Sequence, residues 1–200
     1  MKYIILNLLV LFSFTLNAQL MDVNSRTYTK ADTLRGMLRP ERTCFDVKHY
    51  DLVLDINFDD KTIAGYNDIF FMAVTDFTRI QIDLFENMEI TDIVFAGKSI
   101  NYTREFNAVF IDFPQMIKEG SLNKVSVFYK GQPIIAKNAP WDGGFSWKKD
   151  KKGNDWLGVS CEGIGASLWW PNKDHLSDEP ETMTITCTTP KNLQFVGTGK

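Results

Sequence analysis

The chain has 200 residues, of which 25 are acidic and 22 are basic, so its formal net charge is −3. Nucleic-acid binding draws on an excess of positive charge, and we therefore expect no nucleic-acid partner. The hydrophobic share of 44% and the aromatic share of 13% exclude a disordered chain and predict a packed globular body.

Residues 1–18, MKYIILNLLVLFSFTLNA, have the pattern of a secretory signal peptide. Lys2 supplies the positive start, an apolar run follows, and Ala18 is the small residue before a cleavage site at Gln19. The apolar run is shorter than the roughly 20 residues that span a bilayer. The sequence therefore predicts an exported protein, periplasmic or extracellular, with no membrane association after cleavage.

Residues 19–41 are polar and lack a regular hydrophobic period, and Gly36 and Pro40 interrupt them. We interpret this segment as a leader strap with a short helical turn at Lys30 to Met37, which would become ordered only by docking onto a folded body.

Hydrophobic residues then recur at every second position, as in half-buried strands. Residues 46–60, DVKHYDLVLDINFDD, predict a strand, and residues 63–74, IAGYNDIFFMAV, predict its hairpin partner. Further short strands are expected at residues 79–85, 89–97, 100–106, 108–113 and 124–131. Because no amphipathic helix of ordinary length occurs, the predicted fold class is all-β, an antiparallel β-sandwich with long loops.

From Ala136 onward the pattern predicts a second hairpin, whose strands flank the charged turn KKDKKGND. The segments ETMTITCTTP, residues 181–190, and LQFVGTGK, residues 193–200, are expected to be two more strands. The chain stops directly after a strand-like run, and we expect it to be incomplete at its C-terminal end. The cysteines Cys44, Cys161 and Cys187 allow one disulfide, but buried free thiols are the favoured interpretation.

The sequence gives little support for a metal site or for a catalytic nucleophile. The histidines are His49 and His175, and neither belongs to an HExxH zinc motif or accompanies a GxSxG nucleophile. Acids next to His175 could gather a cation, but a solvated turn is the favoured interpretation. A glycosidase would need two carboxyl groups across a sugar, with Trp141, Trp169 and Trp170 as stacking faces, and this pattern is weakly specific.

Glu162 is more informative than the acids next to His175. It follows a predicted strand and precedes Gly163, Ile164, Gly165 and Ala166, small residues among which backbone can pass close to a ligand. A carboxylate at such a position can receive an amine. An ordinary surface glutamate is the alternative that the residues alone leave open.

The sequence resembles the N-terminal β domain of the aminopeptidase N family, the gluzincin zinc aminopeptidases. The resemblance is carried by DVKHYDLVLDINFDDKTIAGYNDIFF, by PWDGGFSW and by the segment that begins CEGIGASLWWPNKDHLSDEP. It implies a saddle-like all-β domain at residues 42–200, after the signal peptide (1–18) and the leader strap (19–41).

By the same resemblance, Glu162 binds the free α-amine of a peptide substrate, and Gly163 and Gly165 are substrate-binding neighbours. Asp178, Glu179 and Pro180 match a structural D-E-P turn. No catalytic residue and no metal ligand is expected, because the HExxH and GxMEN motifs are absent from this chain.

The function implied is that of the substrate-anchoring domain of an exported zinc aminopeptidase, inactive alone. Zinc would be the cofactor of the full-length protein, and the partners would be the peptide N-terminus and a downstream catalytic domain of the same polypeptide. The alternative is a secreted β-sandwich module that binds carbohydrate or protein.

Overall fold

The computed structural model describes residues 27–197 and residue 199. Residues Ala31–Lys200 make up one compact unit. The predicted signal peptide and residues 19–26 of the predicted leader strap lie outside the described residues. Among the residues that are described, no helix has the length and hydrophobicity needed to span a bilayer.

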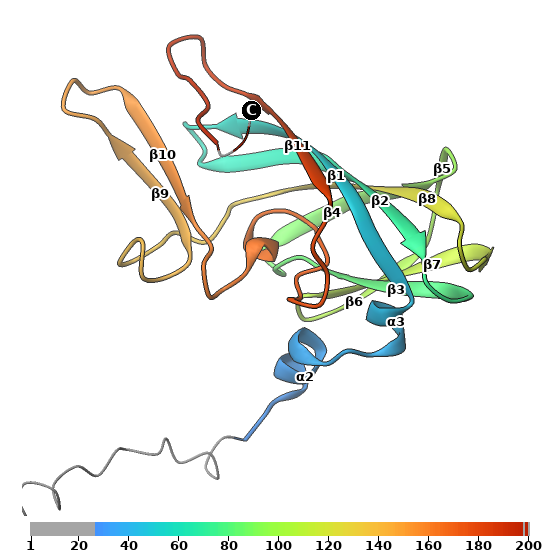
Figure 1. Cartoon of the computed structure of the whole chain (residues 1–200). Helices are drawn as coiled ribbons and strands as arrows, with labels where there is room; N and C mark the ends of the chain where they lie inside the picture. The colour runs from blue at the N-terminus through green and yellow to red at the C-terminus, as the bar shows by residue number, and fades with distance from the viewer. Residues whose placement is uncertain (1–26, 198, 200) are drawn as a thin grey trace, which may run out of the picture. The chain divides into compact units, whose positions relative to one another are not determined.

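Among the described residues, short α-helices precede the strands, and a 3-10 turn lies between the last two strands (Figure 1). The helices are α2 (Lys30–Gly36), α3 (Pro40–Thr43) and the 3-10 turn η2 (Ala166–Leu168). The strands are β1 (Phe45–Asn57), β2 (Thr62–Ala73), β3 (Phe77–Asp83), β4 (Met88–Phe95), β5 (Lys98–Ser99), β6 (Tyr102–Glu105), β7 (Ala108–Ile117), β8 (Leu122–Gly131), β9 (Gly144–Lys149), β10 (Asp155–Ser160) and β11 (Thr182–Thr188).

The strands form a six-stranded sheet in the order β11-β1-β2-β8-β4-β5, a three-stranded sheet in the order β3-β7-β6, and the two-stranded pair β10-β9. Neighbours are antiparallel, except that β11 runs parallel to β1. The predicted hairpin of β1 and β2 is confirmed, with Leu52 opposite Asn67. Figure 1 shows the three-stranded sheet stacked beneath the larger one.

The core lies between these two sheets. Leu52 and Ile69 of the larger sheet and Ile80, Ile82 and Ile111 of the smaller sheet are each fully buried in one hydrophobic cluster. Full burial of such a side chain contributes about 1.5–3 kcal/mol. The alternating pattern in the sequence supplies one buried face per strand, so the prediction of an all-β sandwich is confirmed.

Aromatic rings fill one part of this core. The Phe71 and Phe113 ring centroids are 6.0 Å apart, those of Phe77 and Phe113 are 5.7 Å apart, and those of Phe95 and Phe113 are 4.9 Å apart, all edge to face. This arrangement suits the ring quadrupoles. The strand-spaced aromatic residues therefore pack the interior, as the sequence indicates.

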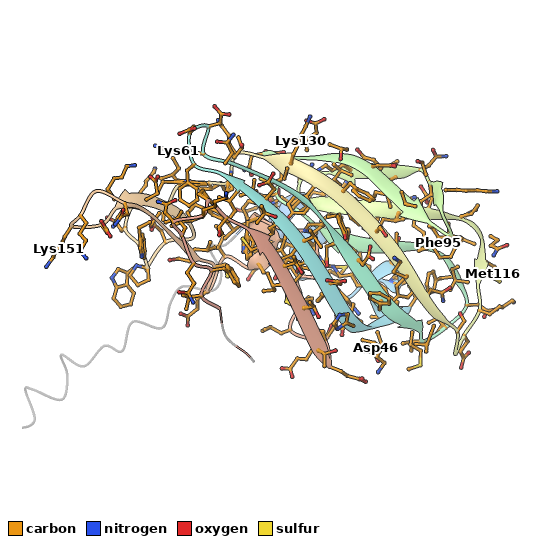
Figure 2. The ribbon with its side chains drawn as sticks, turned by 90° about the horizontal axis from the view of Figure 1, so that it is seen from above. Asp46, Lys61, Phe95, Met116, Lys130 and Lys151 are labelled. Carbon is orange, nitrogen blue, oxygen red and sulfur yellow. The ribbon has the colours of Figure 1, made fainter. Side chains whose placement is uncertain are left out.

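The predicted second hairpin is also confirmed, as β9 and β10. Lys151 marks its tip, which projects beyond the sheets (Figure 2). Asp150 shapes the turn by accepting hydrogen bonds from the backbone N–H groups of Lys152 and Asn154. An ion pair of 2.6 Å joins Lys149 to Asp155 across the hairpin.

The expected strand at residues 193–200 is wrong for the part that the structure describes. Residues 191–197 have no strand, and Val196 is 84% exposed. A strand needs a neighbouring strand to satisfy its backbone groups, and no strand within residues 27–197 pairs with this segment. The β-like composition of LQFVGTGK is therefore not enough by itself to form a strand.

The predicted helical turn of the leader strap is present as α2. Leu34 is its buried residue, at 2% exposure, and lies in a small hydrophobic cluster with Ala108 and Phe110 of β7. The end of the leader strap is thus docked on the three-stranded sheet, as the sequence requires for order in so polar a segment.

Candidate functional site

The residues from Cys161 to Pro180 line much of an open groove of about 850 Å³, and parts of α2, β1 and β11 complete it. This volume lies within the range of about 300–1,000 Å³ that is usual for small-ligand pockets. Of the three predicted site residues, Gly163 and Gly165 line the groove directly, while Glu162 lies beside them in the chain.

Glu162 begins a tight turn after β10. The turn is closed by a hydrogen bond of 2.8 Å from the Gly165 N–H to the Cys161 carbonyl oxygen, and Gly163 has a φ of 76°. The Glu162 side chain is exposed, and among the described residues its carboxylate has no hydrogen-bond or ion-pair partner. An unpaired carboxylate at the edge of a groove can bind an ammonium group.

Gly165 is required by its own geometry. Its φ of 91° and ψ of 155° fall in a region that is essentially open only to glycine. A Cβ atom at this position would also overlap the Asp174 carboxylate. That carboxylate accepts a hydrogen bond of 2.6 Å from the Ser167 hydroxyl. The small residues after Glu162 thus let the chain pass close to an acidic side chain of the same segment.

A buried ion pair supports the other end of the segment. The Lys173 ammonium lies 2.5 Å from the Asp178 carboxylate, and the two side chains are only 4% and 3% exposed. Asp178 also accepts a hydrogen bond from the Val47 N–H, and Lys173 donates to the Phe45 carbonyl oxygen. Asp178 is therefore structural, as the resemblance implies, but it is not in a solvated turn.

Lys173 was not predicted from the sequence. The backbone N–H of Lys173 donates to the Tyr50 hydroxyl, and its ammonium lies 4.3 Å from the centre of the Phe45 ring. A lysine almost never lies fully buried unless it is paired. The only signal in the sequence was an acid five residues farther on, Asp178, which is too common a pattern to indicate burial.

A second buried network joins the segment to β3. The Asp83 carboxylate lies 2.7 Å from the Arg42 guanidinium, and their side chains are 4% and 0% exposed. Asp83 also accepts a hydrogen bond of 3.1 Å from the Asp174 N–H and one of 3.2 Å from the Gln81 amide. Burial raises the pKa of Asp83 to about 6, against the lowering influence of Arg42.

The described residues contain no group of three or more His, Cys, Asp or Glu side chains that could hold a metal ion. The acids near His175 are already engaged: Asp178 pairs with Lys173, and Asp174 accepts from Ser167. His175 itself contacts the Ser177 hydroxyl at 2.9 Å. These residues do not fit a zinc site, whose ligands must converge on one point.

Two of the three tryptophans predicted as stacking faces, Trp169 and Trp170, pack into the protein instead. Trp170 is 7% exposed and packs edge to face against Tyr50, with ring centroids 5.0 Å apart. Trp169 is half-buried and packs against Phe145. Trp141, at 90% exposure, is the freely accessible member of the predicted trio.

Comparison with known proteins gave matches in fold. No family model and no curated protein matched the chain. The M1 zinc metallopeptidase from Deinococcus radiodurans has a similar structure, with 20% identity and a TM-score of 0.52 over 72% of this chain and 32% of that one. Leukotriene A4 hydrolase from Saccharomyces cerevisiae gives 14% identity and a TM-score of 0.59 over 84% of this chain and 27% of that one.

These likenesses establish the fold: the chain is built like part of an M1 zinc metallopeptidase, and the predicted resemblance is confirmed at that level. The chain spans about a third or less of the length of the solved structures it matches.

Proposed function

We propose that this chain is the substrate-anchoring domain of an exported zinc aminopeptidase, in which the Glu162 carboxylate binds the α-ammonium group of a peptide. The observation that carries the proposal is the exposed, unpaired carboxylate on a turn whose Gly163 and Gly165 line the groove. Holding the N-terminal ammonium at a fixed place positions the first peptide bond and restricts cleavage to the end of the substrate.

The solved relatives support this substrate class. One mutant of the Deinococcus radiodurans enzyme was crystallised with a Tyr-Ser-Ala substrate, and a mutant of a two-domain M1 zinc metallopeptidase was crystallised with L-arginine. Both ligands carry an α-amino group. An unpaired carboxylate beside a groove suits such a group, because charge-assisted hydrogen bonds are short and strong.

The proposal assigns zinc to a catalytic domain of the same polypeptide and not to this chain, whose described residues form no metal site. Zinc there would activate the water that attacks the first peptide bond. The residues of this chain would bind and orient the substrate. By itself the chain is proposed to bind peptide without hydrolysing it.

The test is a titration of the chain with Tyr-Ser-Ala and with its N-acetylated form, followed through the backbone amide signals of Gly163 and Gly165 by NMR. We expect the free peptide to shift these signals in a saturable way and the acetylated peptide to leave them in place. Glu162→Ala should abolish the response. An equal response to both peptides, or a response that survives Glu162→Ala, would contradict the proposal.

The chain offers a matched control in Glu119→Ala. Glu119 is also exposed and also precedes a glycine with a φ of 76°, Gly120, but it lies in the turn between β7 and β8. The same change of charge there should leave peptide binding unaltered. In a polypeptide that includes the catalytic domain, Glu162→Ala should raise KM and lower kcat.

A specific observation favours a second candidate, a carbohydrate-binding module. Trp141 is 90% exposed and Trp156 is 50% exposed, and exposed tryptophans suit stacking against sugar rings. Calorimetric titration with a panel of glycans distinguishes the two functions, because a domain that anchors peptides is expected to give no heat of binding with glycans. Saturable binding that is lost in Trp141→Ala would favour the second candidate.

Export rests on the N-terminal sequence pattern, which lies outside the described residues. N-terminal sequencing of the protein recovered from the periplasm or the medium should give a chain that begins at Gln19. A cytoplasmic protein that retains Met1 would contradict this part of the proposal.

A further inference from the structure

The Glu162 turn contacts a segment that is far away in the sequence. The guanidinium of Arg35, on α2, donates a hydrogen bond to the carbonyl oxygen of Ile164 and lies 3.5 Å from that of Gly163. These are carbonyl groups of the turn that carries the Glu162 carboxylate. Both contacts come from Nη2 of Arg35, whose two N–H groups are fixed in the guanidinium plane, so this one nitrogen can reach two neighbouring carbonyl groups.

The helix that carries Arg35 is itself anchored. The Leu34 side chain is buried, and its carbonyl oxygen accepts hydrogen bonds of 3.0 Å from Arg42 and 2.8 Å from Gln81. Arg42 in turn forms the buried ion pair with Asp83. Because both donors are buried, breaking these bonds would leave polar groups without partners at considerable cost. Arg35 therefore extends from a fixed point.

The same anchor also supports the other side of the turn. One oxygen of the Asp83 carboxylate accepts from Arg42, and the second accepts from the Asp174 N–H. The Asp174 side chain accepts hydrogen bonds from Ser167 and occupies the space beside Gly165. Arg35 thus holds the carbonyl groups in the middle of the turn, and Asp174 lies against its last residue, Gly165.

We propose that residues 31–43 are a positioning strap for the candidate site, and that Arg35 is a positioning residue that fixes the orientation of the Glu162 turn at the groove. Arg35 and Gly36 of the strap also line the groove. The consequence for substrate binding rests on the proposed function of Glu162, whereas the effect of the strap on the turn does not. A peptide would therefore meet a carboxylate that is already in place, which lowers the ordering cost of binding.

The test compares Arg35→Met with Arg39→Met. Arg39 belongs to the same strap, but its contacts are Glu41, at 3.5 Å, and the Phe110 ring. Arg35→Met should shift the NMR amide signals of Ile164 and Gly165 and increase their motion, while Arg39→Met should leave them unchanged. Because Leu34 and Arg42 still anchor α2, the midpoint of thermal unfolding should stay the same in both variants.

Peptide binding is the second readout. In Arg35→Met the peptide must order the turn as it binds, and an ordering cost equal to one charge-assisted hydrogen bond makes the Kd for Tyr-Ser-Ala about tenfold higher. Arg35→Lys keeps a charged donor and should therefore retain part of the affinity that Arg35→Met loses. Unchanged amide signals in Arg35→Met would contradict the positioning role proposed for the strap. If the unaltered chain binds no peptide but the turn still becomes more mobile in Arg35→Met, the positioning role of the strap is supported and the proposed function of Glu162 is contradicted.

Discussion

Lys173 and Asp178, five residues apart in the chain, form an ion pair of 2.5 Å with almost no access to water. Both residues line the groove, and Lys173 also donates a hydrogen bond to the Phe45 carbonyl oxygen of β1. It therefore holds the segment that lines the candidate site against the larger sheet. Removing one partner leaves the other charge buried, which typically costs about 3–5 kcal/mol.

We accordingly expect Lys173→Met to lower the free energy of unfolding by about 3–5 kcal/mol, measured by urea denaturation. Lys118→Met is the control, because the exposed pair of Lys118 with Asp76 has a similar separation, 2.7 Å, at exposures of 69% and 44%. Exposed pairs contribute about 0–1 kcal/mol. Equal losses in the two variants would contradict a structural role for the buried pair.

The buried Asp83 carboxyl makes stability depend on pH. Burial raises its pKa to about 6 in the folded protein, compared with about 3.9 in an unfolded chain. The folded protein therefore binds this proton more tightly. The stabilising contribution of proton binding is fully present below about pH 4 and is lost as the pH rises through about 6.

Urea unfolding of the unaltered chain and of Asp83→Asn between pH 4 and pH 7 tests this expectation. Relative to the asparagine variant, which cannot titrate, the unaltered chain should lose about 1–3 kcal/mol as the pH rises. Asp76→Asn is the control: Lys118 lowers the pKa of Asp76, so the contribution of Asp76 is lost only as the pH falls below about 3.9, and its difference from the unaltered chain should stay nearly constant between pH 4 and pH 7. A difference between the unaltered chain and Asp83→Asn that does not vary with pH would exclude Asp83 as the titrating group.

The parts of the fold that the sequence predicts are those with a local signal. Alternation along residues 46–60 is enough to place Leu52 and Leu54 in the core, because the two faces of a strand are set by neighbouring residues. The turn after Glu162 is recognisable for the same reason, since its two glycines stand within three residues of the acid.

The parts that the sequence does not predict depend on partners that are distant in the chain. Arg42 and Asp83 are 41 residues apart, and nothing near either of them indicates that they meet. Lys173 is buried where it contacts Phe45 and Tyr50 of β1, more than 120 residues away in the chain. The segment after Pro190 has strand-like composition, but strand formation depends on a pairing partner, which the composition of the segment cannot supply.

Burial also predicts the reactivity of the cysteines. Cys44 is buried, and this raises its pKa to about 11, so that its thiolate is scarce at neutral pH. Cys161 and Cys187 are only partly buried. Under native conditions at pH 8, iodoacetamide should therefore alkylate both before Cys44, as followed by peptide mass spectrometry.

Alkylation in urea is the control for this experiment, because unfolding removes the burial and should bring the three rates together. If Cys44 reacts as fast as the other two in the native protein, its thiol is not buried as the structure has it.

The last prediction concerns Gly165, whose backbone conformation and close approach to Asp174 both exclude a side chain. Gly165→Ala should lower the free energy of unfolding by about 2–4 kcal/mol, since backbone strain of about 1–3 kcal/mol is joined by the displacement of the carboxylate. Gly120→Ala is the matched control: it shares a positive φ, 76°, but a Cβ atom there would meet no other atom within 4 Å. A loss of only about 1 kcal/mol is expected for it. If urea denaturation gives the two variants the same stability, strain alone accounts for Gly165, and Asp174 does not support the turn.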